Sequence, residues 1–203
     1  MKKECIDELN DFDKQLNVLE SILLSSPRLK EILIRLSEST LSNYYVAAGC
    51  INQTVFNYYH GYDLNYGIED FDIVYFDTDT SYEKEDSIIK YVNGLLKDID
   101  ACYDIKNEAR VHLWYKDKYG KDIVPYTSLE DAISSWGTTV TCIGVRLENN
   151  KLVTYAPYGL EDLFSMTIRP VKRQYTEEQY ELKTKKWKSK WDKLKILPWD
   201  NKS

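Results

Sequence analysis

The chain has little of what several protein classes require. Its 203 residues include only eight glycines and five prolines, which excludes a collagen-like or glycine-rich low-complexity protein. The four cysteines lie far apart and form no Cys-x-x-Cys pair, so neither a zinc site nor a disulfide framework is expected. We expect reduced, mostly buried thiols at Cys5, Cys50, Cys102 and Cys142.

Long apolar runs are also missing. No stretch approaches the roughly 20 apolar residues of a membrane-spanning helix, so no membrane span is expected. The segment from Met1 to Glu8 lacks the apolar core of a secretory signal, and we therefore expect a cytoplasmic protein. With 43% hydrophobic residues and a mean hydropathy of −0.51, the composition is typical of a globular chain with one main core.

Charge is present but unevenly distributed. The whole chain carries a net charge of −6, whereas residues 172–195 contain nine lysines and arginines against four acids. Two interpretations of this basic stretch stay open. It binds nucleic acid or another polyanion, or it is a solvated helix face docked on an acidic body.

The spacing of apolar residues predicts two helices at the N-terminus. Apolar residues from Leu9 to Leu23 recur every three or four positions, which predicts an amphipathic helix over residues 6–24. Ser26 and Pro27 then provide an N-cap and a proline in the first turn. A second helix should begin there and bury Leu29, Ile32, Leu33 and Leu36.

Strand and helix patterns alternate through the rest of the chain, which predicts an α+β fold with a mixed sheet flanked by helices. Expected strands cover 44–48, 71–76 and 101–105, expected helices cover 50–60, 82–98 and 107–118, a short helix begins at Ser128, a hairpin covers 140–147 and 152–156, and a basic helix covers 176–195. In the basic helix one apolar stripe should dock on the body and leave the lysines outside or at a cleft rim; its members are Tyr180, Trp187, Trp191 and Leu194.

Two aspartates carry the main chemical signal. Asp70 and Asp72 enter an expected strand two residues apart, so their side chains point to the same face. Two such carboxylates are able to share Mg²⁺, which proteins hold with one or two carboxylates, waters and substrate phosphates. Upstream, Gly49 ends a strand at a helix start, where free backbone N–H groups favour phosphate.

With these motifs in place, the sequence resembles the polymerase-β-like nucleotidyltransferase superfamily, in which a glycine-containing helix start precedes an acidic pair. It is most similar to a bacterial nucleotidyltransferase-like family, the domain of unknown function 925 group. The likeness runs from about Tyr45 to Trp191. It rests on the blocks Ala48 to Ile51, Glu69 to Asp77, Lys106 to His112, Gly144 to Arg146, Ala156 to Phe164, and Arg169-Pro170.

The resemblance implies a set of site residues. Asp70 and Asp72 would hold Mg²⁺ or Mn²⁺, and the nucleotide would be bound by Gly49, Cys50, Asn107 and Arg110. A third carboxylate is expected on a neighbouring strand: Asp104 is the first candidate and Glu108 the second. For Arg110 a surface ion pair is an equally good interpretation.

The resemblance also implies the organisation and the function. Residues 1–40 would form a helical segment packed on a nucleotidyltransferase-like domain of residues 41–203. That domain would transfer a nucleotidyl group from an NTP to an acceptor hydroxyl, and residues 172–195 would contact nucleic acid if the acceptor is one. The alternative is a catalytically silent binding or regulatory module, which Cys50 favours because the superfamily has a small hydroxyl residue or glycine there.

Overall fold

The computed structural model describes residues 11–200. Eight α-helices, one 3₁₀ helix and seven strands are assigned within that range. In chain order they are α1 (Phe12–Ser25), α2 (Pro27–Ser37), β1 (Tyr44–Ala47), α3 (Gly49–His60), β2 (Phe71–Tyr75), α4 (Tyr82–Leu95), β3 (Tyr103–Asn107), η2 (Glu108–Arg110), α5 (Val111–Tyr119), α6 (Leu129–Ile133), β4 (Gly144–Glu148), β5 (Lys151–Tyr155), α7 (Glu161–Phe164), β6 (Thr167–Ile168), α8 (Glu177–Lys190) and β7 (Lys195–Ile196).

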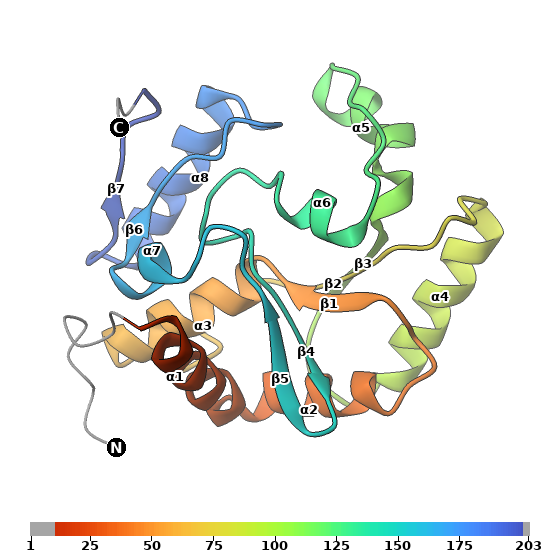
Figure 1. Ribbon diagram of the computed structural model, residues 1–203, viewed down its shortest axis with the longest axis horizontal. Helices are drawn as coiled ribbons and strands as arrows, with labels where there is room; N and C mark the ends of the chain where they lie inside the picture. Colours follow the sequence, from red (N-terminus) through yellow and green to blue (C-terminus); the bar gives the residue numbers. More distant parts are fainter. Residues whose placement is uncertain (1–10, 201–203) are drawn as a thin grey trace.

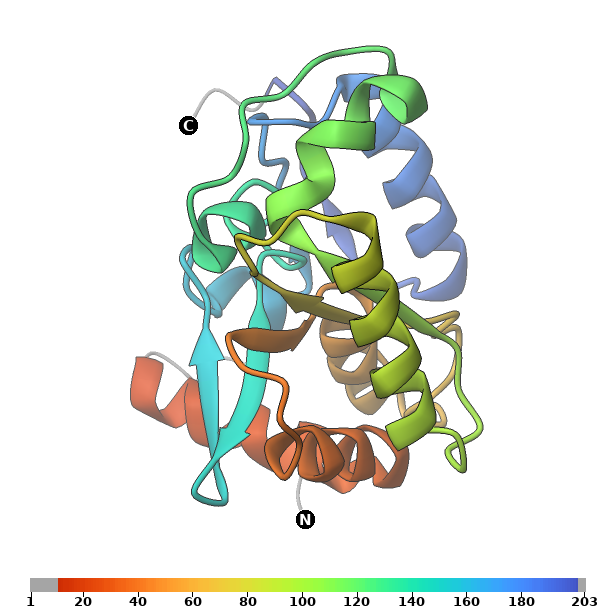
Figure 2. The same cartoon turned by 90° about the vertical axis from the view of Figure 1, so that its right-hand side faces the viewer.

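A five-stranded mixed sheet forms the centre, in the order β3-β2-β1-β4-β5. In this sheet only β2 and β3 are parallel to each other. The chain returns between them through α4, so that β3 starts at the same edge of the sheet as β2. Helices α1 and α2 lie at one end of the molecule, and α5 and α8 lie at the other (Figures 1 and 2). The mixed α+β sheet flanked by helices that the sequence predicts is confirmed.

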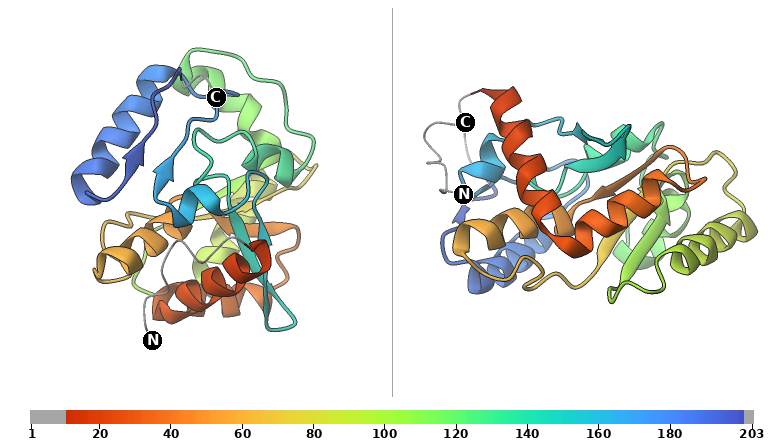
Figure 3. Two further views of the ribbon diagram at one scale, coloured as in Figure 1. Left: turned by 60° about the vertical axis from the view of Figure 1, so that its left-hand side comes forward. Right: turned by 90° about the horizontal axis from the view of Figure 1, so that it is seen from below.

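The two N-terminal helices form as their sequence predicts. Ser26 caps α2 by accepting a hydrogen bond from the Leu29 N–H, and Pro27 occupies the first turn. All four apolar residues expected to face inward are fully buried, and they belong to the same core cluster as the sheet: Leu29, Ile32, Leu33 and Leu36. Residues 6–10 of the expected first helix lie outside the described range. Figure 3 shows α1 and α2 from below, crossing that end of the fold.

Two expected helices end earlier than predicted. Helix α4 ends at Leu95 and not at 98, and α8 ends at Lys190 and not at 195, because Trp191 is extended and caps the helix.

Three other element boundaries differ from the predicted ones for identifiable reasons. Strand β3 begins two residues late because the Ala101 N–H closes a tight turn onto the Ile99 carbonyl. The Asn107 side chain caps a 3₁₀ turn before α5 begins. In the expected hairpin, residues 140–143 form no strand, because the Thr138 carbonyl accepts hydrogen bonds from the Thr141 and Cys142 N–H groups.

Helix α8 docks through the predicted aromatic stripe. Tyr180, Trp187, Trp191 and Leu194 are each no more than 5% exposed. The Trp191 indole N–H donates to the Asn57 side-chain oxygen of α3 over 2.7 Å, and its ring lies edge-on to Phe56. Helix α8 therefore has a fixed place against α3. No helix within residues 11–200 combines the length and the apolar character that crossing a membrane requires.

Truncating Trp191 tests this docking. We expect Trp191→Ala to lower the free energy of unfolding by about 3–5 kcal/mol, measured by urea denaturation. Trp191→Phe keeps an aromatic ring but leaves the Asn57 oxygen without its donor, which costs about 1–3 kcal/mol. The matched control is Leu182→Ala on the same helix, where the side chain is 72% exposed and the change should stay within about 0.5 kcal/mol. Equal effects of the alanine variants would contradict the docking.

Candidate active site

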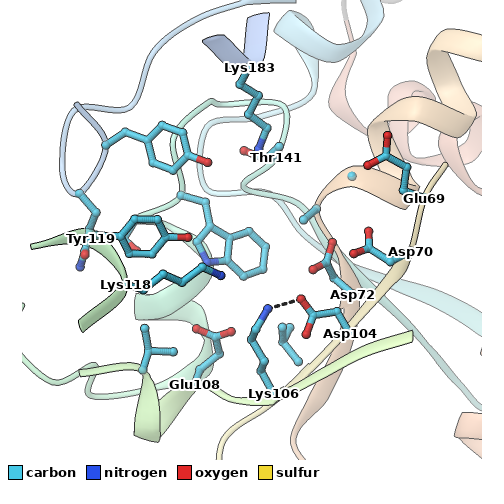
Figure 4. Close-up of a pocket in the computed structure, with 18 of the residues that line it drawn as sticks. Glu69, Asp70, Asp72, Asp104, Lys106, Glu108, Lys118, Tyr119, Thr141 and Lys183 are labelled. Atoms are coloured by element: carbon cyan, nitrogen blue, oxygen red, sulfur yellow. Dashed lines mark hydrogen bonds and ion pairs between the residues drawn. The ribbon is translucent and has the colours of Figure 1, made fainter. Parts of the chain in front are cut away.

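A cleft of about 420 Å³ lies between the sheet and two helices that come from distant parts of the chain. The first wall consists of the β1–α3 turn and the edge of β2 and β3, and it includes Gly49, Asp70, Asp72 and Asp104. The second wall consists of α5, α8 and the loop after α6. Figure 4 shows Asp70 and Asp72 across this space from Lys118, with Lys106 joined to Asp104.

Strand register brings the expected carboxylates together on the first wall. Asp72 and Asp104 are direct partners on the parallel strands β2 and β3, so their side chains leave the sheet on the same face. Asp70 lies two residues before Asp72 and lines the same cleft. Figure 4 shows these three carboxylates side by side.

The environment of Asp72 disfavours its charge. Burial raises the pKa of Asp72 to about 7, the nearby negative charges of Asp70 and Asp104 add to that rise, and the Lys106 ammonium opposes it. Asp104 is less available, because its carboxylate forms an ion pair with Lys106. Among the negative charges that raise the pKa of Asp72, that of Asp70 has the largest effect.

This donor set fits a divalent cation. Two hard carboxylate oxygens that lie close together, one withdrawn from water, gain from a cation that offsets their repulsion. Within residues 11–200, no three His, Cys, Asp or Glu side chains converge closely enough to hold a metal by themselves. Two carboxylates, with waters and substrate phosphates as the other ligands, are a common way for proteins to hold Mg²⁺.

The turn before α3 has an unusual backbone. Ala48 takes a positive φ of 55° and caps α3 without a side-chain hydrogen bond, although a non-glycine residue there is strained. Gly49 follows, and a Cβ at that position would lie 2.9 Å from the Gln53 amide nitrogen and 4.0 Å from an Asp72 oxygen. The strained turn thus brings the helix N-terminus directly beside Asp72.

Glu108, the second candidate for a third carboxylate, also lines the cleft. It begins η2 and is only 4% exposed. Burial raises its pKa to about 8 against the opposing effect of Lys106. The two candidates for the third carboxylate therefore differ. Asp104 is paired with Asp72 across the parallel strands, whereas Glu108 is buried and its raised pKa favours the protonated form at neutral pH.

Three other residues implied by the resemblance lie outside the cleft lining. The Arg110 guanidinium binds Glu85 over 2.6 Å and the Ser81 carbonyl over 3.2 Å. The Asn107 amide joins the end of β3 to the Asp77 backbone. Cys50 is fully buried, and its thiol donates to the Ala47 carbonyl. These three side chains stabilise local structure. Arg110 forms an ion pair with Glu85, as one of its two interpretations predicts.

The lysines of α8 reach the cleft, which the sequence indicated only as one of two alternatives. Lys183, Lys186 and Lys190 all line it. The Lys186 and Lys190 ammonium groups bind the Glu69 carboxylate over 2.7 and 3.3 Å, and they hold the pKa of Glu69 below its usual value. Spacing on α8 could have identified these three lysines, because positions three and four apart share a helix face.

The comparisons with known proteins agree with this geometry. A family model described as nucleotidyltransferase matches residues 35–196, which is most of the chain. The chain belongs to the nucleotidyltransferase family. A solved NMR structure described as revealing a CCA-adding enzyme head domain is similar to this nucleotidyltransferase at 24% identity and a TM-score of 0.70.

That likeness covers 96% of this chain and 100% of the other, and it shows a shared fold. The comparison with curated proteins gives no match. The finer likeness of this nucleotidyltransferase to the domain of unknown function 925 group stays a prediction.

The buried acid Glu108 generates a prediction for pH dependence. Its pKa is about 8 in the folded chain against an ordinary value of 4.5. Between these values the unfolded chain releases the proton and the folded chain keeps it, so the Glu108 contribution to stability falls as the pH rises. The Glu108→Gln side chain does not ionise, so the variant does not lose stability in this way. We expect its melting temperature to exceed that of the wild type only slightly below pH 4.5 and most at pH 8.

Thermal melts of the wild type and Glu108→Gln at the two pH values measure this effect. Glu83→Gln on the exposed side of α4 is the matched control, and it should shift the melting temperature little at either pH. A Glu108→Gln effect that is the same at both pH values would show that this carboxyl is already ionised in the folded chain.

Proposed function

We propose that the chain transfers a nucleotidyl group from an NTP to an acceptor hydroxyl, with Mg²⁺ or Mn²⁺ held by Asp70 and Asp72. The observation that carries this proposal is the single cleft in which these two carboxylates lie beside the α3 N-terminus and face the lysines of α8. When bound, the cation would polarise the phosphate oxygens and offset their charge.

The chemistry requires one bond to form and one to break. The acceptor oxygen bonds to the α-phosphorus, the bond to the β-phosphate breaks, and pyrophosphate leaves with that electron pair. The acceptor proton needs a base, and Asp104 is the best placed because its strand register sets it beside Asp72. Its ion pair with Lys106 must then loosen when the acceptor binds, and Lys106 would be free to contact a phosphate.

The phosphates have two sets of partners in this arrangement. Backbone N–H groups at the start of α3 and the positive end of the helix dipole favour the β- and γ-phosphates beside Gly49. Lys186 and Lys190 lie on the facing wall, where both bind the Glu69 carboxylate. A triphosphate would replace that partly exposed carboxylate as the counter-charge of both lysines.

The second candidate function is a binding module without catalysis. The buried thiol of Cys50 and the occupied carboxylate of Asp104 favour it, and the basic stretch of residues 172–195 would be its contact surface. If residues 172–195 bind phosphates, nucleic acid would be the acceptor of the enzyme or the partner of the binding module. The structure described as a CCA-adding enzyme head domain supports this class of acceptor.

Replacing Asp72 separates the two functions. We expect Asp72→Asn to lower metal-dependent pyrophosphate release by more than about a hundredfold, since even residues that only support metal ligands contribute 10- to 100-fold. The assay screens the four NTPs with Mg²⁺ or Mn²⁺, with and without cell extract as the source of acceptor. The melting temperature should be unchanged or higher, because removing one of two crowded carboxylates relieves their repulsion.

The control variant is Asp98→Asn, which changes an exposed carboxylate far from the cleft lining. It should leave both pyrophosphate release and melting temperature unchanged. Normal turnover by Asp72→Asn would end the metal assignment. Nucleotide binding by the wild type without turnover under any of the conditions would support the silent module instead.

A further inference from the structure

The second wall of the cleft is unusually aromatic. Six aromatic side chains from α5, the α5–α6 connection, the loop after α6 and the segment before α8 line it together with Trp187: Trp114, Tyr115, Tyr119, Tyr126, Trp136 and Tyr175. Tyr119 is 42% exposed, and Trp114, Trp136 and Tyr175 are half-buried. Large aromatic rings left open to a cleft mark a binding surface more often than a core.

The Tyr175 ring packs against Gly137, which has no side chain to block it. A Cβ at Gly137 would lie only 2.2 Å from the Tyr175 ring, so the ring rests directly on the backbone next to Trp136. The Val171 N–H donates to the Gly137 carbonyl, which ties the two segments together before Tyr175. The Tyr175 ring is therefore held against the backbone next to Trp136, and both side chains line the cleft.

Two lysines lie against aromatic rings of the second wall. The Lys118 ammonium lies 5.5 Å from the Trp114 ring centre and 5.4 Å from that of Tyr119. The Lys183 ammonium lies 5.6 Å from the Tyr175 ring centre and 5.0 Å from that of Trp187. Neither lysine forms an ion pair within the part of the chain that the structure describes. Their charges are available to an anionic ligand.

We infer that Trp136 and Tyr175 stack the nucleobase of the NTP, with Lys183 and Lys118 beside its phosphates and sugar. This inference rests on the proposed function for the direction of the phosphates, which lie toward Gly49 and Asp72. Lys183 lines the same cleft as Asp72 and Gly49, so it lies on the path from the aromatic rings to the phosphates. Stacking uses the ring faces that every base has, so the subsite accepts all four bases with little preference.

The size and charge of the cleft favour one nucleotide as the occupant. A volume of about 420 Å³ is in the range of sites for small ligands. An uncharged aromatic ligand would leave the lysines unused, and a simple polyphosphate would leave the aromatic rings uncovered. A ligand with both an aromatic ring and phosphates satisfies the two sets of side chains at once.

Binding with and without the base tests the inference. Isothermal titration compares ATP with ribose 5-triphosphate, which lacks the base, in the presence of Mg²⁺. Stacking is worth about 1–3 kcal/mol per base, so the wild type should bind ATP about tenfold more tightly than ribose 5-triphosphate. Trp136→Ala should remove this difference and leave the affinity for ribose 5-triphosphate unchanged, and Trp136→Phe should keep most of it.

Gly137→Ala offers an independent test through Tyr175. The added Cβ should displace the Tyr175 ring and reduce the preference for ATP several-fold. The matched control is Gly94→Ala on α4, where an added Cβ meets nothing within 4 Å and binding should not change. Thermal melts show which variants fold, and Tyr175→Ala, which removes the other stacking ring, replaces any variant that does not.

Equal affinities of the wild type for ATP and ribose 5-triphosphate would overturn the inference. The same holds if Trp136→Ala and Gly137→Ala both keep the full preference for ATP. Failure of the proposed function looks different, since Asp72→Asn would then retain turnover or the wild type would have none. A silent module that binds ATP through Trp136 would still show the loss of preference in these titrations.

Discussion

The buried hydrogen bond between the Trp191 indole and Asn57 is the contact on which the second wall of the cleft depends. Asn57 also donates to the Leu64 and Tyr66 carbonyls, so one side chain joins α3, the loop before β2 and the end of α8. The same helix α3 begins at Gly49. A single rigid element therefore carries the turn beside the carboxylates at its start and the anchor of the lysine-bearing helix near its end.

This arrangement explains why an acidic chain keeps a concentrated basic segment. The carboxylates of Asp70 and Asp72 and the ammonium groups of α8 face one another across the cleft, and each set makes the other less costly to bring together. Glu69 holds two of the lysines in place. Lys183, Lys186 and Lys190 line the cleft, whereas the other six basic residues of 172–195 do not. A nucleotide with its cation carries both signs of charge and suits such a space.

Local patterns in the sequence predict the carboxylate wall well. Alternation in β2 sets Asp70 and Asp72 on one face, and the glycine after β1 marks the helix start beside them. The same reasoning does not predict the contacts of Asn107 and Arg110. Their partners Asp77 and Glu85 lie in the segment from the end of β2 into α4, and only the tertiary fold brings them together. Trp136 and Tyr175 lie in segments without periodicity, where only the tertiary fold shows that Gly137 seats an aromatic ring. The stripe on α8 predicts docking, but the partner of Trp191 is 134 residues away.

The long separation between α3 and α8 has a consequence for biosynthesis. While the chain is being translated, the carboxylates, the helix start and the whole of the sheet emerge before α8 does. A growing chain that has not reached Trp191 holds the acids but lacks the lysines and the anchor that bring the cleft to its final shape. Such a chain has α5 and the loop after α6 but lacks the part of the second wall that α8 forms, so its cleft is incomplete on that side until α8 is synthesised.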